Sequence, residues 1–247
     1  MKYTDTYQVR FSETDHRGHL SPRALYNFLQ DTATNHSTSV GLSGEPLLEK
    51  GYGWMLHHLI VEMEELPLID AGLSVTTWGH CLHGLYAVRE WLVHDGTGAV
   101  RARGTSRYVL IDVKKGRASR LPAFLAERYG EHPDERALDV EFQKPRDTEE
   151  CEFSTTVQVR HGELDTNYHA NSATYIEWCL DTVPESVITT HRVNRMELVY
   201  KLEAKHGDIL RVETNLSSPP TGFSHCVYHN ESNELITTGK SEWTELE

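Results

Sequence analysis

The sequence predicts an α+β fold of two tandem repeats, each with a long helix packed against a curved antiparallel sheet. The first observation is the repeat itself: residues 8–32 and 158–182 align without a gap and are identical at eight of 25 positions. Random pairing would give about one or two identities. The other two observations are a helix pattern after each copy and strand patterns after each helix. The identical pairs are Gln8/Gln158, Val9/Val159, Arg10/Arg160, Glu13/Glu163, Asp15/Asp165, His19/His169, Asp31/Asp181 and Thr32/Thr182.

Each copy of the repeat runs into a predicted helix. In the first, Ser21 is a suitable N-cap and Pro22 suits the first helical position. In the second, Asn171 or Ser172 is the cap, and the apolar face is wider. The apolar positions at helical spacing are Leu25, Phe28, Leu29 and Ala33 in the first helix, and Tyr175, Ile176, Trp178, Cys179, Leu180 and Val183 in the second.

About four strands follow each predicted helix. The turn "HDGTGAV" separates two of them in the first half, and "HNESNE" separates two in the second. The expected strands are residues 54–66, 73–82, 86–95 and 99–113, then 195–204, 209–217, 223–230 and 234–246. One helix across one face of a curled antiparallel sheet is the hot-dog arrangement, so the chain is expected to be a double hot dog.

The domain boundaries follow from the repeat. We expect an N-terminal hot-dog repeat at residues 1–121 and a C-terminal one at 151–247. Residues 122–150 are acidic and contain Pro122, Pro133 and Pro145, which is typical of a linker.

Composition narrows the class of function. The chain has 37 acidic and 24 basic residues and a net charge of −13, which argues against nucleic-acid binding. No apolar run has the length of a membrane helix, which needs roughly 18 residues. The N-terminus lacks a signal or transit pattern, and the four cysteines are scattered, as in reduced proteins. The expected location is the cytoplasm.

The segment "ELDTNYHANSATYIEW", from Glu163 to Trp178, carries the candidate chemistry. Asp165, Asn167 and His169 alternate, so an extended backbone would place a carboxylate, an amide and an imidazole on one side. They lie where the second helix begins, and the positive end of a helix dipole stabilises an anionic oxygen. The segment predicts an active site at this helix N-terminus.

These residues resemble the acyl-acyl-carrier-protein (acyl-ACP) thioesterase family along nearly the whole chain. The family's D-x-N-x-H-x-N segment reads here Asp165, Asn167, His169 and Asn171, followed by Tyr175 and Trp178. Its "M-x-L-x-Y" strand, which ends in a Glu, is "MELVYKLEA" and places Glu203. "LYNFLQDTATNH" and "REWLVHDGTGAVRARGTSRYVLID" are similar in the first half. The resemblance implies hydrolysis of fatty acyl-ACP, with an acyl carrier protein as partner and no cofactor.

One position departs from the family. Plant members often have Cys directly after that Glu, where this chain has Ala204, so a cysteine nucleophile is excluded at that position. Glu203 is then expected to act as general base, and Asp165 either as nucleophile or as the residue that orients His169. Asn167 would position water or the carbonyl. A covalent acyl-enzyme and direct attack by water both remain open.

Other residues have weaker predicted roles. Asn171, Tyr175, Trp178 and Trp54 are candidates for substrate binding, although Asn171 fits a helix cap better and the two aromatic residues of the second helix fit the core better. The first repeat keeps Asp15 and His19 but has Arg17 in place of Asn167. It is therefore expected to be a degenerate site whose sheet helps to form the acyl-chain pocket.

Metal and nucleotide sites are not expected. Neither "HH" at His57–His58 nor the glycines of "DGTGAV" match such a motif, and no G-x-S-x-G segment occurs.

The carrier protein is expected to dock on a local basic patch. The segment from Arg101 to Arg120 has seven Lys or Arg residues and one acid, and Lys114, Lys115 and Arg117 are its candidate contacts. Two other functions remain open: an acyl-CoA thioesterase, and a non-catalytic module that binds acyl thioesters. Acyl-chain length and saturation are not predicted, and homodimer formation is left open.

Overall fold

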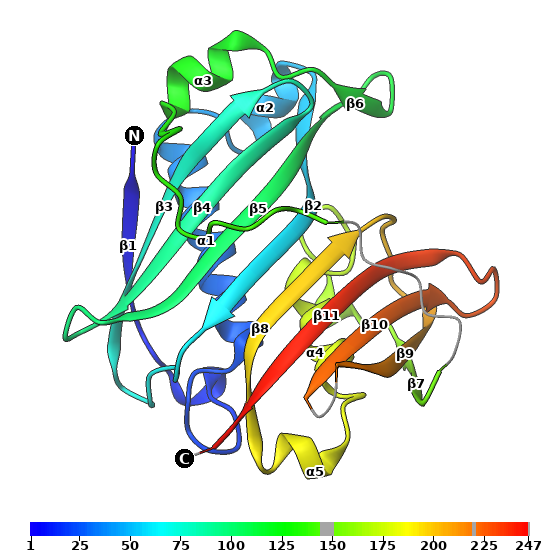
Figure 1. Cartoon of the computed structure of the whole chain (residues 1–247). Helices are drawn as coiled ribbons and strands as arrows, with labels where there is room; N and C mark the ends of the chain where they lie inside the picture. The colour runs from blue at the N-terminus through cyan, green and yellow to red at the C-terminus, as the bar shows by residue number, and fades with distance from the viewer. Residues whose placement is uncertain (144–150, 219–220, 247) are drawn as a thin grey trace. The chain divides into compact units, whose positions relative to one another are not determined.

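The computed structural model describes residues 1–143, 151–218 and 221–246. The chain divides into two compact units, Met1–Glu141 and Phe142–Glu247 (Figure 1). None of the described helices combines the length and apolar character that crossing a lipid bilayer requires.

The first unit is a five-stranded antiparallel sheet with one long helix. The sheet order is β1-β3-β4-β5-β2, and the short β6 pairs with β5. Helix α1 lies against β1 and β3 (Figure 1). The elements are β1 (Tyr3–Gln8), the 3-10 helix η1 (Phe11–Glu13), α1 (Pro22–Ser39), α2 (Glu45–Glu49), β2 (Tyr52–Met63), β3 (Gly72–His83), β4 (Tyr86–Asp95), β5 (Val100–Asp112), β6 (Arg117–Ser119) and α3 (Ala123–Tyr129).

The second unit repeats this topology. Its antiparallel sheet has the order β8-β11-β10-β9-β7, and α4 lies against β9, β10 and β11. Each half is the predicted strand, helix and four further strands, so the α+β class and the double hot-dog arrangement are confirmed. The elements are β7 (Phe153–Gln158), the 3-10 helix η2 (His161–Glu163), α4 (Ser172–Leu180), α5 (Glu185–Ile188), β8 (His191–Tyr200), β9 (Ile209–Ser218), β10 (Gly222–His229) and β11 (Leu235–Glu245).

The length of one helix and the position of one strand differ from the predictions in ways that affect the site. Helix α4 has 9 residues against 18 in α1, so the second helix is not long. Its early end has a local cause, because Pro184 lacks an N–H and disfavours helical backbone at Val183. Strand β8 ends at Tyr200, so Glu203 lies in the following loop, whereas the predicted strand ran to residue 204.

Helix α1 is fixed by its cap and by its apolar face. The N–H of Ala24 donates to Ser21 Oγ at 3.2 Å, as predicted for an N-cap. Leu25, Phe28 and Leu29 are 1–3% exposed, and each such buried side chain stabilises the fold by roughly 1.5–3 kcal/mol. The indole of Trp91 on β4 donates to the carbonyl of Leu29 at 3.1 Å, which fixes the helix over the sheet.

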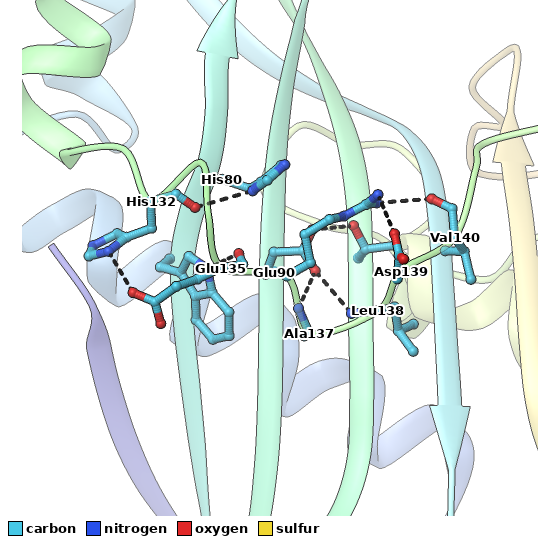
Figure 2. Close-up of polar contacts among 11 residues, drawn as sticks. His80, Glu90, His132, Glu135, Ala137, Leu138, Asp139 and Val140 are labelled. Atoms are coloured by element: carbon cyan, nitrogen blue, oxygen red, sulfur yellow. Dashed lines mark hydrogen bonds and ion pairs between the residues drawn. The ribbon is translucent and has the colours of Figure 1, made fainter.

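The predicted linker is largely part of the first unit. Residues 123–129 form α3, and residues 131–141 pass along β3, β4 and β5 on the face opposite α1 (Figures 1 and 2). There the fully buried Glu90 accepts the N–H groups of Ala137 and Leu138 at 3.0 and 3.4 Å and the hydroxyl of Thr105 at 2.8 Å (Figure 2). Burial raises the pKa of Glu90. The rest of the predicted linker includes residues 144–150, which lie outside the described residues.

A one-way chain of hydrogen bonds ties α4 to its sheet. Because Thr182 donates to the carbonyl of Cys179, its oxygen is left to accept from Thr214, which in turn accepts from His225 Nδ1. His225 Nε2 therefore accepts from Ser241, whose oxygen accepts the indole N–H at 3.0 Å. From donor to acceptor the chain runs Trp243, Ser241, His225, Thr214, Thr182, Cys179. Because His225 donates through Nδ1 and must accept through Nε2, this series of hydrogen bonds requires the imidazole to be neutral.

The pH dependence of stability should reveal this neutral histidine. Complete burial lowers the pKa of His225 to about 3, from about 6.5 in the unfolded chain. Between these values the unfolded state binds a proton that the folded state does not. The contribution of neutral His225 to the free energy of unfolding is therefore complete above pH 6.5 and is lost as the pH falls toward 3. One such proton gives a slope of up to about 1.4 kcal/mol per pH unit.

Denaturant unfolding at several pH values measures this slope. The variant His225→Gln, which retains a donor and an acceptor, should be less stable at neutral pH but should lose stability less steeply on acidification. His16→Gln, which removes an exposed imidazole, is the control and should keep the parent slope. An unchanged slope in His225→Gln would contradict the assignment.

Candidate active site

Asp165 closes a tight turn at the start of the candidate site. Its Oδ1 accepts the backbone N–H groups of Asn167 at 2.8 Å and His169 at 3.2 Å. The N–H of Asp165 in turn donates to the carbonyl of His169 at 2.8 Å, and Tyr168 has a left-handed φ of 63°. The prediction of an extended segment is therefore wrong, because Asp165 bonds its own backbone two and four residues on, as Asx turns do.

The same turn occurs in the first unit. Asp15 Oδ1 accepts the N–H groups of Arg17 at 2.9 Å and His19 at 3.1 Å, and the turn passes through Gly18 at φ 81°. The guanidinium of Arg17 also pairs with Asp15 at 3.2 Å. Since both aspartates hold the same turn, the turn itself accounts for their presence in the two repeats.

The imidazole of His169 meets the carboxylate of Glu203. Nε2 and Oε2 are 3.1 Å apart, with side-chain exposures of 27% and 53%, so solvent reaches both groups. Two contacts fasten the loop that carries Glu203 to the turn: the N–H of Ala170 donates to the carbonyl of Ala204 at 2.8 Å, and His169 forms a bridge with Lys205. The structure thus brings together two predicted residues that are 34 positions apart.

Tyr175 anchors this loop from beneath. Its hydroxyl accepts the N–H of Ala204 at 3.2 Å, and its ring is 2% exposed. Burial raises the pKa of the hydroxyl above its ordinary value. The ring packs edge-to-face on Trp178, which is 4% exposed, and on Tyr200. The structure therefore places Tyr175 and Trp178 in the core, and Tyr175 also positions the loop.

The two asparagines of the motif have different surroundings. Asn171 caps α4, with its Oδ1 accepting the N–H of Ala173 at 2.9 Å. Its carbonyl also accepts the N–H of Thr174, so these two donors at the helix start are already used. Asn167 has an exposed side chain, whose amide makes a long contact of 3.4 Å to Asp165. Of the two amides, that of Asn167 is the better placed to meet a ligand.

The two units differ at the position of Glu203. In the first, the N–H of Leu20 donates to the carbonyl of Pro67 at 2.8 Å, which corresponds to the bond between Ala170 and Ala204. The residue equivalent to Glu203 is therefore Leu66, whose carbonyl accepts from His19 Nδ1 at 2.6 Å. Glu203 and Leu66 are 137 residues apart, whereas the residues of the ungapped repeat are 150 apart, so that alignment could not pair these two positions.

Thiols and metal ligands lie elsewhere in the described part of the chain. Cys179 and Cys226 are buried, and burial raises the pKa of Cys179. Ala204 is 0% exposed, so a side chain at this position faces the interior rather than a substrate. Cys81, His83 and Glu131 are the one group in the described residues whose ligand atoms, within 4.8 Å of one another, could hold a metal.

The remaining candidates belong to the first unit. Trp54 on β2 is half-buried against the core cluster that contains Val40 and Leu110, with its ring edge toward Tyr108. Lys114, Lys115 and Arg117 are exposed at the β5–β6 hairpin. Lys115 pairs with Asp112 at 2.7 Å, which offsets part of the positive charge there.

Comparison with known proteins identifies the family. Residues 1–129 match the acyl-ACP thioesterase N-terminal domain, and residues 146–245 match the acyl-ACP thioesterase C-terminal domain. The chain belongs to the acyl-ACP thioesterase family.

Three proteins that this chain is similar to share 23–26% sequence identity with it. Oleoyl-acyl carrier protein thioesterase 2 of Arabidopsis thaliana is 23% identical over 98% of this chain and 76% of its own length. A dodecanoyl-[acyl-carrier-protein] hydrolase of Cinnamomum camphora is 26% identical over 96% of this chain and 66% of its own length. The crystal structure of an acyl-ACP thioesterase from Bacteroides thetaiotaomicron superimposes with a TM-score of 0.83, at 25% identity over 98% of both chains.

Replacing Tyr175 with Phe should test the anchor under the Glu203 loop. The variant keeps the ring but leaves the buried N–H of Ala204 without its acceptor. The free energy of unfolding should fall by about 1–3 kcal/mol, as measured by denaturant titration. Tyr86→Phe, at an exposed tyrosine, is the control and should change stability little. Equal effects of the two substitutions would show that the hydrogen bond from Ala204 to the Tyr175 hydroxyl does not stabilise the fold.

Proposed function

We propose that this chain hydrolyses the thioester of fatty acyl-ACP, releasing a fatty acid and the free carrier protein. Membership of the acyl-ACP thioesterase family supports the substrate class. The observation that carries the chemistry is the contact between His169 and Glu203, 3.1 Å apart and reached by solvent at the start of α4.

The pair supplies an acid and a base for hydrolysis. Glu203 accepts the N–H of His169 Nε2, which orients the imidazole and stabilises the imidazolium that forms when the pair takes up a proton. Attacking water loses that proton to the pair as its oxygen bonds to the thioester carbon. The carbon–sulfur bond then breaks, and the proton passes to the leaving thiolate. The products are a carboxylic acid and a thiol, so atoms and charges balance.

Direct attack by water is favoured over a covalent route through Asp165. Two backbone N–H groups and the Asn167 amide donate to its carboxylate, so lone pairs that a nucleophile would use are already engaged in holding the turn. Asp15 has matching backbone bonds in a unit where Leu66 replaces the acid. Asp165 is therefore a positioning residue that orients His169 through the turn.

The negative charge of the tetrahedral intermediate also needs stabilisation. The exposed amide of Asn167 can donate to that oxygen, and the positive end of the α4 dipole lies next in the chain. Asn171 contributes indirectly, because capping Ala173 fixes where α4 begins.

An acyl-CoA thioesterase would use the same site, because its substrate has the same thioester. A binding module has no need of an acid–base pair, so the contact between His169 and Glu203 favours an enzyme over that alternative. We also propose that the β5–β6 hairpin attracts the acidic carrier protein through Lys114, Lys115 and Arg117, whose side chains are exposed.

Substitution of the pair tests the proposed function. His169→Ala and Glu203→Gln should each lower kcat for acyl-ACP by about 10²–10⁴-fold while the protein stays folded, because each removes a proton-transfer group. His19→Ala is the matched control, since it removes the equivalent histidine from the equivalent turn, and it should retain nearly full activity. Near-full activity in folded His169→Ala, or equal losses in the two histidine variants, would refute the assignment.

Charge reversal tests the docking surface. Changing Lys114, Lys115 and Arg117 together to Glu should lower kcat/KM for acyl-ACP, mainly through slower association. The loss should shrink with added salt, as screening acts over about 8 Å at physiological ionic strength. A small acyl thioester without the carrier is the control substrate and should be hydrolysed at the parent rate. Equal losses on both substrates would indicate damage to the fold, and no loss would place docking elsewhere.

A further inference from the structure

Tyr168 adopts a backbone conformation that its residue type disfavours. It is one of three non-glycine residues in the described chain with positive φ, at 63°; the others are Asp70 at 65° and Asn233 at 58°. Asp and Asn tolerate this region because their short polar side chains bond locally, whereas a bulky aromatic residue is strained there. The equivalent position in the first unit is Gly18, at φ 81°, which has no such strain.

No packing compensates for this strain, because Tyr168 is 79% exposed. It directly precedes His169. On the facing loop, Leu202 directly precedes Glu203 and is 48% exposed. Their equivalents in the first unit are Gly18 and the exposed Glu65. Exposed apolar side chains therefore directly precede both members of the acid–base pair in the second unit, and neither equivalent position of the first unit has an apolar side chain.

We propose that Tyr168 and Leu202 bind the pantetheine arm of the thioester substrate, an inference that rests on the proposed function. The arm joins the thioester to the carrier protein or to CoA, so it must pass the rim of the site. It alternates amide groups with short apolar segments, which suits a tyrosine that offers both an apolar face and a hydroxyl. The other two parts of the substrate fit these side chains less well. A fatty acyl chain requires a buried apolar pocket, which exposed side chains do not form. The acidic surface of the carrier protein would be bound by basic residues.

The test uses Tyr168→Gly and two thioesters of one fatty acid, one with pantetheine and one with ethanethiol. The substitution removes the ring and relieves the strain. The melting temperature should therefore rise, by about 2–4 °C for each kcal/mol gained in a chain of this size. kcat/KM for the pantetheine thioester should fall about tenfold, mostly through KM, since the lost contact acts in binding. The ethanethiol thioester should react at nearly the parent rate.

Two further variants distinguish the loss of the Tyr168 side chain from the change in backbone strain. Asp70→Gly makes the corresponding change at the positive-φ residue of the first unit, where the second unit has Gly207, and should leave both reactions unchanged. Tyr168→Phe should retain most of the binding. Equal losses on both thioesters in Tyr168→Gly would show that the residue only shapes the turn that carries His169. No loss on either would exclude contact with the arm.

A binding measurement keeps this inference distinct from the proposed function. Calorimetry with a hydrolysis-resistant pantetheine thioether of the same acyl chain needs no turnover. If the parent protein hydrolyses neither these thioesters nor acyl-ACP, the proposed function fails. Weaker thioether binding by Tyr168→Gly than by the parent would still support the contact, and equal binding would overturn it.

Discussion

The carboxylate of Asp165, bonded to the backbone two and four residues ahead, is the constraint on which the candidate site depends. It turns the chain so that the N–H of Ala170 donates to the carbonyl of Ala204, and this hydrogen bond places Glu203 beside His169. The same turn places Asn171 at the N-cap position of α4. Without the turn, the imidazole, the acid and the helix N-terminus would have no fixed relation to one another.

Buried polar contacts fix both helices over their sheets. In the second unit the link is the chain through His225, and in the first it is Arg89 on β4, which donates to His36 on α1 at 3.1 Å. Burial, and then the nearby charge of Arg89, lowers the pKa of His36 to about 3. Each unit thus holds a neutral imidazole that links its helix to its sheet, from α1 in the first unit and from β10 in the second. A hydrogen bond has a defined direction, so these contacts specify how each helix lies on its sheet more sharply than apolar packing does.

Much of the fold could be predicted because its signals are local. A strand pattern followed by a turn sequence gave β4 its observed limits, 86–95, and Ser21 and Asn171 act as the expected caps. The candidate site was only partly predictable. Spacing alone suggested an extended segment, but the Asx turn of Asp165 overrides that geometry. Glu203 was named as a site residue through family resemblance, but its contact with His169 joins distant segments and was not predicted. Glu90 gave no signal, because an acid in a strand pattern is ordinarily solvated, and its burial depends on residues 131–141 crossing the sheet.

The substitution of Leu66 for an acid bears on how such a chain can evolve. When two identical subunits pair, every change in the gene appears in both, so one copy cannot discard an acid that the other retains. Here the two loop positions belong to separate codons. The N-terminal copy can therefore carry Leu66, and an Arg17 that pairs with Asp15, while the C-terminal copy carries Glu203. Fusion of the repeats gives up symmetry, and in return the two halves can carry different residues at equivalent positions of their turns and loops.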